Sequence, residues 1–127
     1  MSSVVLDASA LLALIFAERG GDIVAAALSS AVMTSVNYSE VATRLYDQGM
    51  TQGEIQARLE TFELEVVAFD REIALAAAAL RPLTRHVGLS LGDRACLALA
   101  GHLGLPAMTA DRPWAQLDVG VPVQVIR

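Results

Sequence analysis

The sequence contains no lysine, because all nine of its basic residues are arginine. This absence excludes every mechanism that needs a catalytic or phosphate-binding lysine. Positive charge is scarce as well: fourteen acidic residues give a net charge of −5 and an isoelectric point near 4.8. This balance argues against binding nucleic acid through a general basic surface, so a nucleic-acid ligand would require metal ions and local arginines.

Cysteine and long apolar runs are also scarce. The single Cys96 cannot form an internal disulfide, and its apolar neighbours predict a buried, unreactive side chain. The longest charge-free stretch, residues 23–39, is interrupted by serine, threonine and asparagine and falls short of a membrane span. No basic segment precedes the first apolar run, as a secretory signal would require. These absences predict a cytoplasmic protein.

Apolar residues, in contrast, are abundant. They make up 54% of the 127 residues, and the mean hydropathy is +0.49. A chain of this length forms one domain with one core, and such a core cannot cover this much apolar surface. The excess predicts an interface with a partner or with a second copy of the chain.

Hydrophobic patterning and capping residues predict alternating strands and helices. We expect strands at 4–6, 31–35, 63–69, 107–109 and 121–126. We expect helices at 8–17, 22–28, 51–61, 73–80 (capped by Asp70), 90–103 and 113–117, and one that ends near 48 and has Glu40 in its first turns. This order predicts a three-layer α/β/α fold, a single domain over 1–127, with a mostly parallel central sheet of four to five strands.

Four acidic residues stand at the ends of these elements. Asp7 and Asp111 follow strands, Glu40 lies in the first turns of a helix, and Asp93 opens another helix. Ligands bind outside the carboxyl ends of parallel strands, so the four can converge there. Each alone could equally be a solvated or helix-capping acid. Together they would repel one another unless a cation lay among them.

Such a cluster suits phosphodiester hydrolysis. One or two Mg²⁺ or Mn²⁺ ions held by carboxylates can activate water and stabilise the leaving oxygen. Aspartate-nucleophile phosphatases and receiver domains use similar acids, but they normally need a lysine, and the second residue after Asp7 is Ser9 rather than another acid. A non-catalytic binding module, whose acids serve only partner recognition, remains the alternative.

Four segments carry a resemblance to a known family. They are Val5-Leu6-Asp7-Ala8-Ser9-Ala10-Leu11, Ser39-Glu40-Val41, the run from Leu89 to Ala100 that contains Gly92-Asp93-Arg94, and Met108-Thr109-Ala110-Asp111. In order and spacing the sequence resembles PIN-domain ribonucleases, specifically the VapC toxins of VapBC toxin-antitoxin pairs. The resemblance covers essentially the whole chain. It implies a Mg²⁺- or Mn²⁺-dependent endoribonuclease that is inhibited by a cognate antitoxin.

The resemblance also assigns roles to residues. Asp7, Glu40, Asp93 and Asp111 would be the metal-binding, catalytic acids. Ser9 and Thr109 match positions where hydroxyl residues support the site, although capping or a turn explains them equally well. Apart from the resemblance, Arg94 and Arg112 directly follow two of the acids, so they could hold phosphate or orient a carboxylate; surface ion pairs explain them equally well. Asn37 and Tyr38 precede Glu40 and could line the cleft, although Tyr38 better fits a core residue with its hydroxyl at the edge. We expect His86 and His102 at the surface, and Trp114 as an anchor of the last helix or a base-stacking side chain.

The expected partners follow from the same resemblance. They are a VapB-type antitoxin, a second copy of the chain in a homodimer, and an RNA substrate, with transfer RNA the first candidate and ribosomal RNA the second. The apolar helical segments 11–16 and 45–59 are candidate docking surfaces, though such stripes also form cores. The sequence leaves the RNA and the number of metal ions open.

Overall fold

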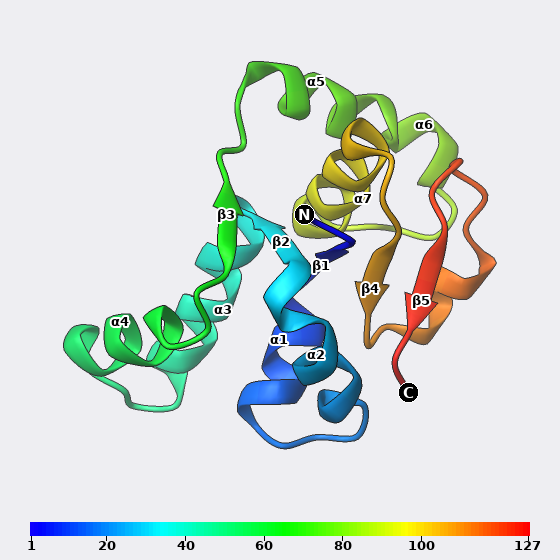
Figure 1. The fold of residues 1–127 in the computed structure, drawn as a ribbon. Coiled ribbons are helices and arrows are strands. Elements are labelled where there is room, and N and C mark those ends of the chain that lie inside the picture. Colours follow the sequence, from blue (N-terminus) through cyan, green and yellow to red (C-terminus); the bar gives the residue numbers. More distant parts are fainter.

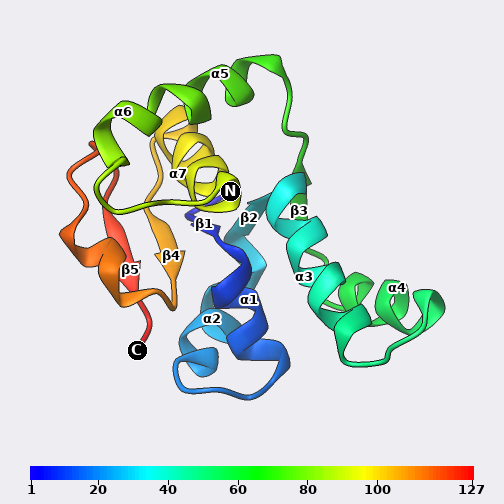
Figure 2. The same ribbon diagram turned by 180° about the vertical axis from the view of Figure 1, so that it is seen from behind.

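The computed structural model describes residues 1–127 and contains one five-stranded sheet (Figures 1 and 2). The strands are β1 (Val4–Leu6), β2 (Ala31–Thr34), β3 (Glu65–Val67), β4 (Ala107–Thr109) and β5 (Val123–Val125). The helices are α1 (Ala8–Ile15), α2 (Gly21–Ala27), α3 (Ser35–Asp47), α4 (Gln52–Glu60), α5 (Arg71–Ala79), α6 (Arg81–Thr84) and α7 (Leu91–Leu103), with short 3-10 turns η1 (Leu28–Ser30) and η2 (Arg112–Gln116).

All neighbouring strands are parallel, in the order β3-β2-β1-β4-β5. The chain first moves from β1 through β2 to β3, and then returns across the sheet through α5, α6 and α7 to β4 on the other side of β1. The direction of winding therefore reverses between β1 and β4. In open parallel sheets this switch point, at the carboxyl ends of the strands, is where ligands bind.

The three central strands β2, β1 and β4 are buried on both faces, and the alternation of side chains along the strands explains how. In β1, Val4 and Leu6 belong to the core that contains Leu11 of α1 and Leu45 of α3, whereas Val5 belongs to the core of α5 and α7. Successive strand residues point to opposite faces, so each central strand contributes to both cores. The arrangement is the predicted three-layer α/β/α fold.

Helix starts agree closely with prediction because capping signals are local. Thr51 and Glu54 form the predicted capping box of α4, and Asp70 accepts a hydrogen bond from the Ile73 N–H at the start of α5. Gly104, with φ 67°, ends α7 as predicted. The prediction was wrong for the end of the first helix, which stops at Ile15 rather than residue 17, because Ala17 has the left-handed φ of 53°.

The docking stripes predicted on the helices are mostly core. Leu11, Leu45, Ile55 and Leu59 are at most 4% exposed and belong to the core on the α1 and α3 side of the sheet. Tyr46 of α3, in contrast, is 52% exposed. No helix in the structure has the length and hydrophobicity of a membrane span.

Candidate active site

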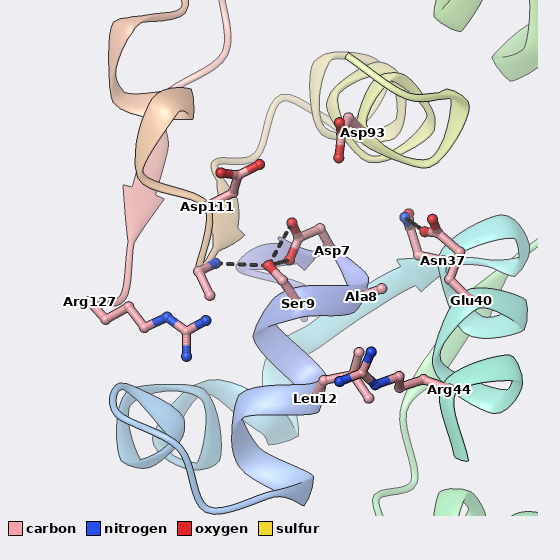
Figure 3. A pocket seen from close by; sticks show the side chains of 11 residues that line it. Asp7, Ala8, Ser9, Leu12, Asn37, Glu40, Arg44, Asp93, Asp111 and Arg127 are labelled. Carbon is pink, nitrogen blue, oxygen red and sulfur yellow. Dashed lines mark hydrogen bonds between the residues drawn. The ribbon is translucent and has the colours of Figure 1, made fainter. Parts of the chain in front are cut away.

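The four acids identified from the sequence line one cavity of about 440 Å³. Asp7 follows β1, Glu40 lies on α3, Asp93 is in the first turn of α7, and Asp111 follows β4. Figure 3 shows their side chains around a common space at the carboxyl ends of β1 and β4. Residues more than a hundred positions apart in the sequence are thus brought together by the reversal of winding between these two strands.

Asp7 is the most enclosed of the four acids, at 4% exposed. Its Oδ1 caps α1 by accepting from the Ala10 N–H over 2.8 Å, and its Oδ2 accepts from the Thr109 hydroxyl. The Ser9 hydroxyl lies 2.8 and 2.9 Å from the two carboxylate oxygens. Burial raises the pKa of Asp7 from 3.8 to about 6. These hydrogen bonds lower the pKa, and the nearby charge of Asp93 raises it further.

The hydroxyls of Ser9 and Thr109 also join the two central strand ends. Ser9 Oγ accepts from the Ala110 N–H over 2.9 Å, and Thr109 Oγ1 accepts from the Asp111 N–H over 3.0 Å. Each hydroxyl therefore contacts both the Asp7 carboxylate and the backbone that follows β4. This network fixes the position of Asp7 relative to the segment that carries Asp111.

Glu40 contacts two other elements. Its Oε1 accepts from Asn37 Nδ2 over 2.8 Å, and its carboxylate lies against Gly92 of α7. Partial burial raises the pKa of Glu40, and the charge of Asp93 adds to the rise, while the hydrogen bond from Asn37 lowers it. Asp93 therefore influences both Asp7 and Glu40 electrostatically.

Asp93 and Asp111 each retain oxygens without a hydrogen-bond partner. Asp93 Oδ2 accepts from the Ser90 N–H over 2.9 Å and completes a capping box at the start of α7. Capping is thus one of its roles, as the sequence allowed. Asp111 precedes η2, but its side chain makes no capping bond.

The cations at the cavity are not those that the sequence indicated. Arg44 of α3 and Arg127 line it, and in Figure 3 their guanidinium groups lie on either side of α1. Arg127 also pairs with Glu18 over 3.3 Å. Arg94, in contrast, donates to the Ala77 carbonyl of α5, and Arg112 donates to the Arg127 carbonyl, so neither side chain lines the cavity. Arg44 lies one helical turn beyond Glu40, so its place on the same face of α3 could have been predicted from the sequence.

Most of the other residues that the sequence singled out lie outside the cavity. Trp114 is fully buried and has no face available for a base. His102 is exposed and lies 3.6 Å from Glu72, and Tyr38 packs partly against the core. Cys96 is buried in the core of α5 and α7, and burial raises its pKa, helped by the charges of Asp7, Asp93 and Glu40. Asn37 does line the cavity.

The carboxylate oxygens of the four acids are suitable ligands for a hard divalent cation. The four side chains do not, however, enclose a complete coordination site. None of the four acids belongs to an ion pair, so their charges are not neutralised by protein cations. No three acidic, histidine or cysteine side chains converge at ligand distance. Mg²⁺ normally keeps several waters and takes only one or two carboxylates directly, so an open cavity of this volume fits a hydrated ion.

Comparisons with known proteins agree with this architecture. The structure resembles a toxin-antitoxin complex chain from Klebsiella pneumoniae (TM-score 0.73, 21% identity, 98% of each chain covered). It also resembles a chain of the DNA-bound VapBC from Salmonella typhimurium (0.74, 18%, 100% of each) and one of VapBC-5 from Mycobacterium tuberculosis (0.58, 27%, 100% of this chain and 99% of the other).

The two sequence comparisons give different results. Among curated proteins, no sequence matches the chain. The family model for the PIN domain, however, matches residues 4–120 and includes all four acids of the cavity. The chain therefore belongs to the PIN-domain family.

Proposed function

We propose that this protein is a VapC-type toxin: an endoribonuclease that depends on Mg²⁺ or Mn²⁺, acts in the cytoplasm and is inhibited by a cognate antitoxin. The observation that carries the proposal is the set of four carboxylates, from four different elements, that surround one cavity and form no ion pair with a protein cation. PIN domains are generally nucleases, and several similar structures are VapBC complexes. Both facts support the proposal.

In this proposal Asp7, Glu40, Asp93 and Asp111 hold the metal. A bound divalent ion would activate a water and stabilise charge on the phosphate and the leaving 3′-oxygen. The protein's part is to fix the carboxylates: the Ser9 and Thr109 hydroxyls orient Asp7, and Asp93 is held at the start of α7 by Ser90. The product would carry a 5′-phosphate.

Arg44 and Arg127 are the natural phosphate contacts. They are the cations among the cavity-lining residues, and guanidinium groups bind phosphate oxygens in a bidentate manner. The net charge of −5 makes such local cations important, since the surface as a whole repels RNA. In this proposal Arg94 and Arg112 act indirectly, by bracing α7 against α5 and by holding the C-terminal segment.

The proposal includes two protein partners. A groove of about 280 Å³ between α3 and α4, lined by residues that include Tyr38, Tyr46 and Ile55, is our candidate site for an apolar antitoxin segment. A basic side chain of the antitoxin would suit the acidic cavity. The exposed Leu75, Leu83 and Leu91 offer apolar area for a homodimer.

The test is RNA cleavage by purified protein freed of antitoxin and of metal. Total RNA is incubated with the protein, with Mg²⁺ or Mn²⁺ restored, and Asp7→Asn is run in parallel. We expect discrete cleavage only with metal and only by the natural sequence, first in transfer RNA and second in ribosomal RNA, with 5′-phosphate ends. Adding the antitoxin should abolish cleavage.

A non-catalytic binding module is the competing function. It predicts no metal-dependent cleavage of any RNA, and weaker antitoxin binding by Asp7→Asn, because its acids would serve partner recognition. The nuclease proposal predicts instead that Asp7→Asn loses cleavage and retains antitoxin binding. Folded protein that binds Mn²⁺ but cuts none of the cellular RNAs would favour this alternative.

A further inference from the structure

Asn37 connects three elements at the edge of the acidic cavity. Its backbone N–H donates to Thr34 Oγ1 over 3.0 Å, and the Thr34 hydroxyl donates to Asn37 Oδ1 over 2.7 Å. Its Nδ2 group donates to Glu40 Oε1 over 2.8 Å and to the Gly92 carbonyl over 3.0 Å. The amide oxygen and both amide hydrogens are therefore used, which fixes the side chain in one orientation.

The hydrogen bonds of the Asn37 side chain are not needed to cap α3. The N-cap of α3 requires only Thr34 and the backbone N–H of Asn37. The side-chain amide instead links Glu40 to the first turn of α7. Because Asn37 is 1% exposed and Thr34 fully buried, water cannot replace either partner easily, and the geometry is held firmly.

Gly92 supplies the space that Glu40 occupies. A Cβ at this position would lie 2.5 Å from Glu40 Cδ and still closer to both carboxylate oxygens. Gly92 lies within α7, where glycine disfavours the helix relative to alanine. The close approach of the Glu40 carboxylate therefore explains why glycine stands there.

We propose that Asn37 is the positioning residue of Glu40 and that Gly92 provides the site for its carboxylate. Together they hold Oε1 and leave Oε2 without a protein hydrogen bond, available to a divalent ion. This inference rests on the proposed function, because it assumes that Glu40 binds metal. In this inference Glu40 contacts the metal, whereas Asn37 and Gly92 determine how tightly the metal binds.

Two alanine substitutions in α7 form a matched test. Gly92→Ala displaces the Glu40 carboxylate, which is the flexible end of a side chain, so the fold should survive. Gly101→Ala makes the same change in the same helix, where the new Cβ meets only Val121 at the ordinary distance of 3.6 Å. Titration calorimetry with Mn²⁺ on the metal-free full chain should show affinity about 10- to 100-fold weaker for Gly92→Ala and unchanged for Gly101→Ala.

A second pair tests the amide. Asn37→Ala should weaken Mn²⁺ binding similarly, whereas Thr51→Ala, which removes the N-cap of α4 far from the cavity, should lower stability without changing Mn²⁺ affinity. For both Asn37→Ala and Gly92→Ala, raising the Mn²⁺ concentration should restore much of kcat, with KM for RNA little changed. A merely structural role would not give this metal-dependent recovery.

The outcomes are distinct. Equal Mn²⁺ affinity in Gly92→Ala and the natural sequence would overturn the inference and leave the proposed function standing. The same loss of affinity in Gly101→Ala as in Gly92→Ala would also overturn it, because the effect would then belong to α7 as a whole. Failure of the natural sequence to bind Mn²⁺ would remove both the inference and the proposed function.

Discussion

Replacing Asp7 with asparagine should stabilise the metal-free protein while abolishing cleavage. Asp7 is 4% exposed, and its pKa rises from 3.8 to about 6 in the folded state. A shift of this size means that ionised Asp7 destabilises the fold, relative to its neutral form, by about 3 kcal/mol. Asparagine has nearly the same shape and cannot ionise, so the variant avoids this penalty.

The hydrogen bonds around Asp7 offset part of the gain. Asparagine can still accept from the Ala10 N–H, and Asp and Asn cap helices about equally well. The bonds from Ser9 and Thr109, however, lose their charged acceptor and weaken. We therefore expect Asp7→Asn to raise the free energy of unfolding at pH 8, without metal, by roughly 1 to 3 kcal/mol.

The pH dependence gives the sign of the effect. Because the folded pKa of Asp7 is higher than the unfolded value, the folded state binds the proton more tightly. Asp7 therefore favours folding below about pH 4, and this contribution is lost as the pH rises through about 6. The advantage of Asp7→Asn should be full at pH 8 and nearly absent at pH 4.

Urea unfolding followed by the fluorescence of Trp114, the single tryptophan and a fully buried one, measures this difference in a chelator from pH 4 to 8. Asp70→Asn is the matched control, since Asp70 is also an N-cap but lies outside the acidic cavity. It should change stability by only a few tenths of a kcal/mol. An Asp7→Asn variant that is less stable at pH 8, or a difference that does not vary with pH, would refute the reasoning.

Further predictions concern metal, RNA and the backbone. Millimolar Mg²⁺ should stabilise the natural sequence in the same urea assay but not Asp7→Asn, because only a folded, ionised site binds the ion; equal stabilisation of both would contradict the site. Arg44→Gln should raise KM for RNA and reduce the salt dependence of KM by about one phosphate contact; an unchanged salt slope would place Arg44 outside the RNA path. Gly20→Ala should lower the free energy of unfolding by about 1 to 3 kcal/mol in urea melts, because Gly20 has φ 91° and a new Cβ would lie 2.5 Å from the Ile126 carbonyl; a neutral effect would mean that the loop relaxes freely.

Elements whose signals are local could be predicted from the sequence, whereas edge strands could not be delimited. The strand Ala107–Thr109 has the predicted bounds, and the capping box at Thr51 marks the start of α4. The edge strands were expected at 63–69 and 121–126 but comprise only Glu65–Val67 and Val123–Val125. Their extents depend on pairing with β2 and β4, which no local pattern contains.

The residues of the cavity, like the strands, could be predicted only in part. The four acids could be placed together because residues that follow parallel strands share one edge of the sheet. The neighbouring arginines could not be placed by sequence adjacency, because successive helical residues point about 100° apart: Asp93 lines the cavity, while Arg94 points to Ala77 of α5. Arg127 was missed because its place depends on Glu18, more than a hundred residues away.

Two of the four acids stabilise the elements that position them, and this affects how any variant must be interpreted. Asp7 caps α1, and Asp93 completes the capping box of α7, so alanine at either position would remove a helix cap together with a charge. Loss of activity would then follow from a disordered helix start as readily as from a lost metal ligand. Asparagine removes the charge and keeps an acceptor for the cap. Unchanged or raised stability combined with lost Mn²⁺ binding therefore assigns the carboxylates to the metal rather than to the fold.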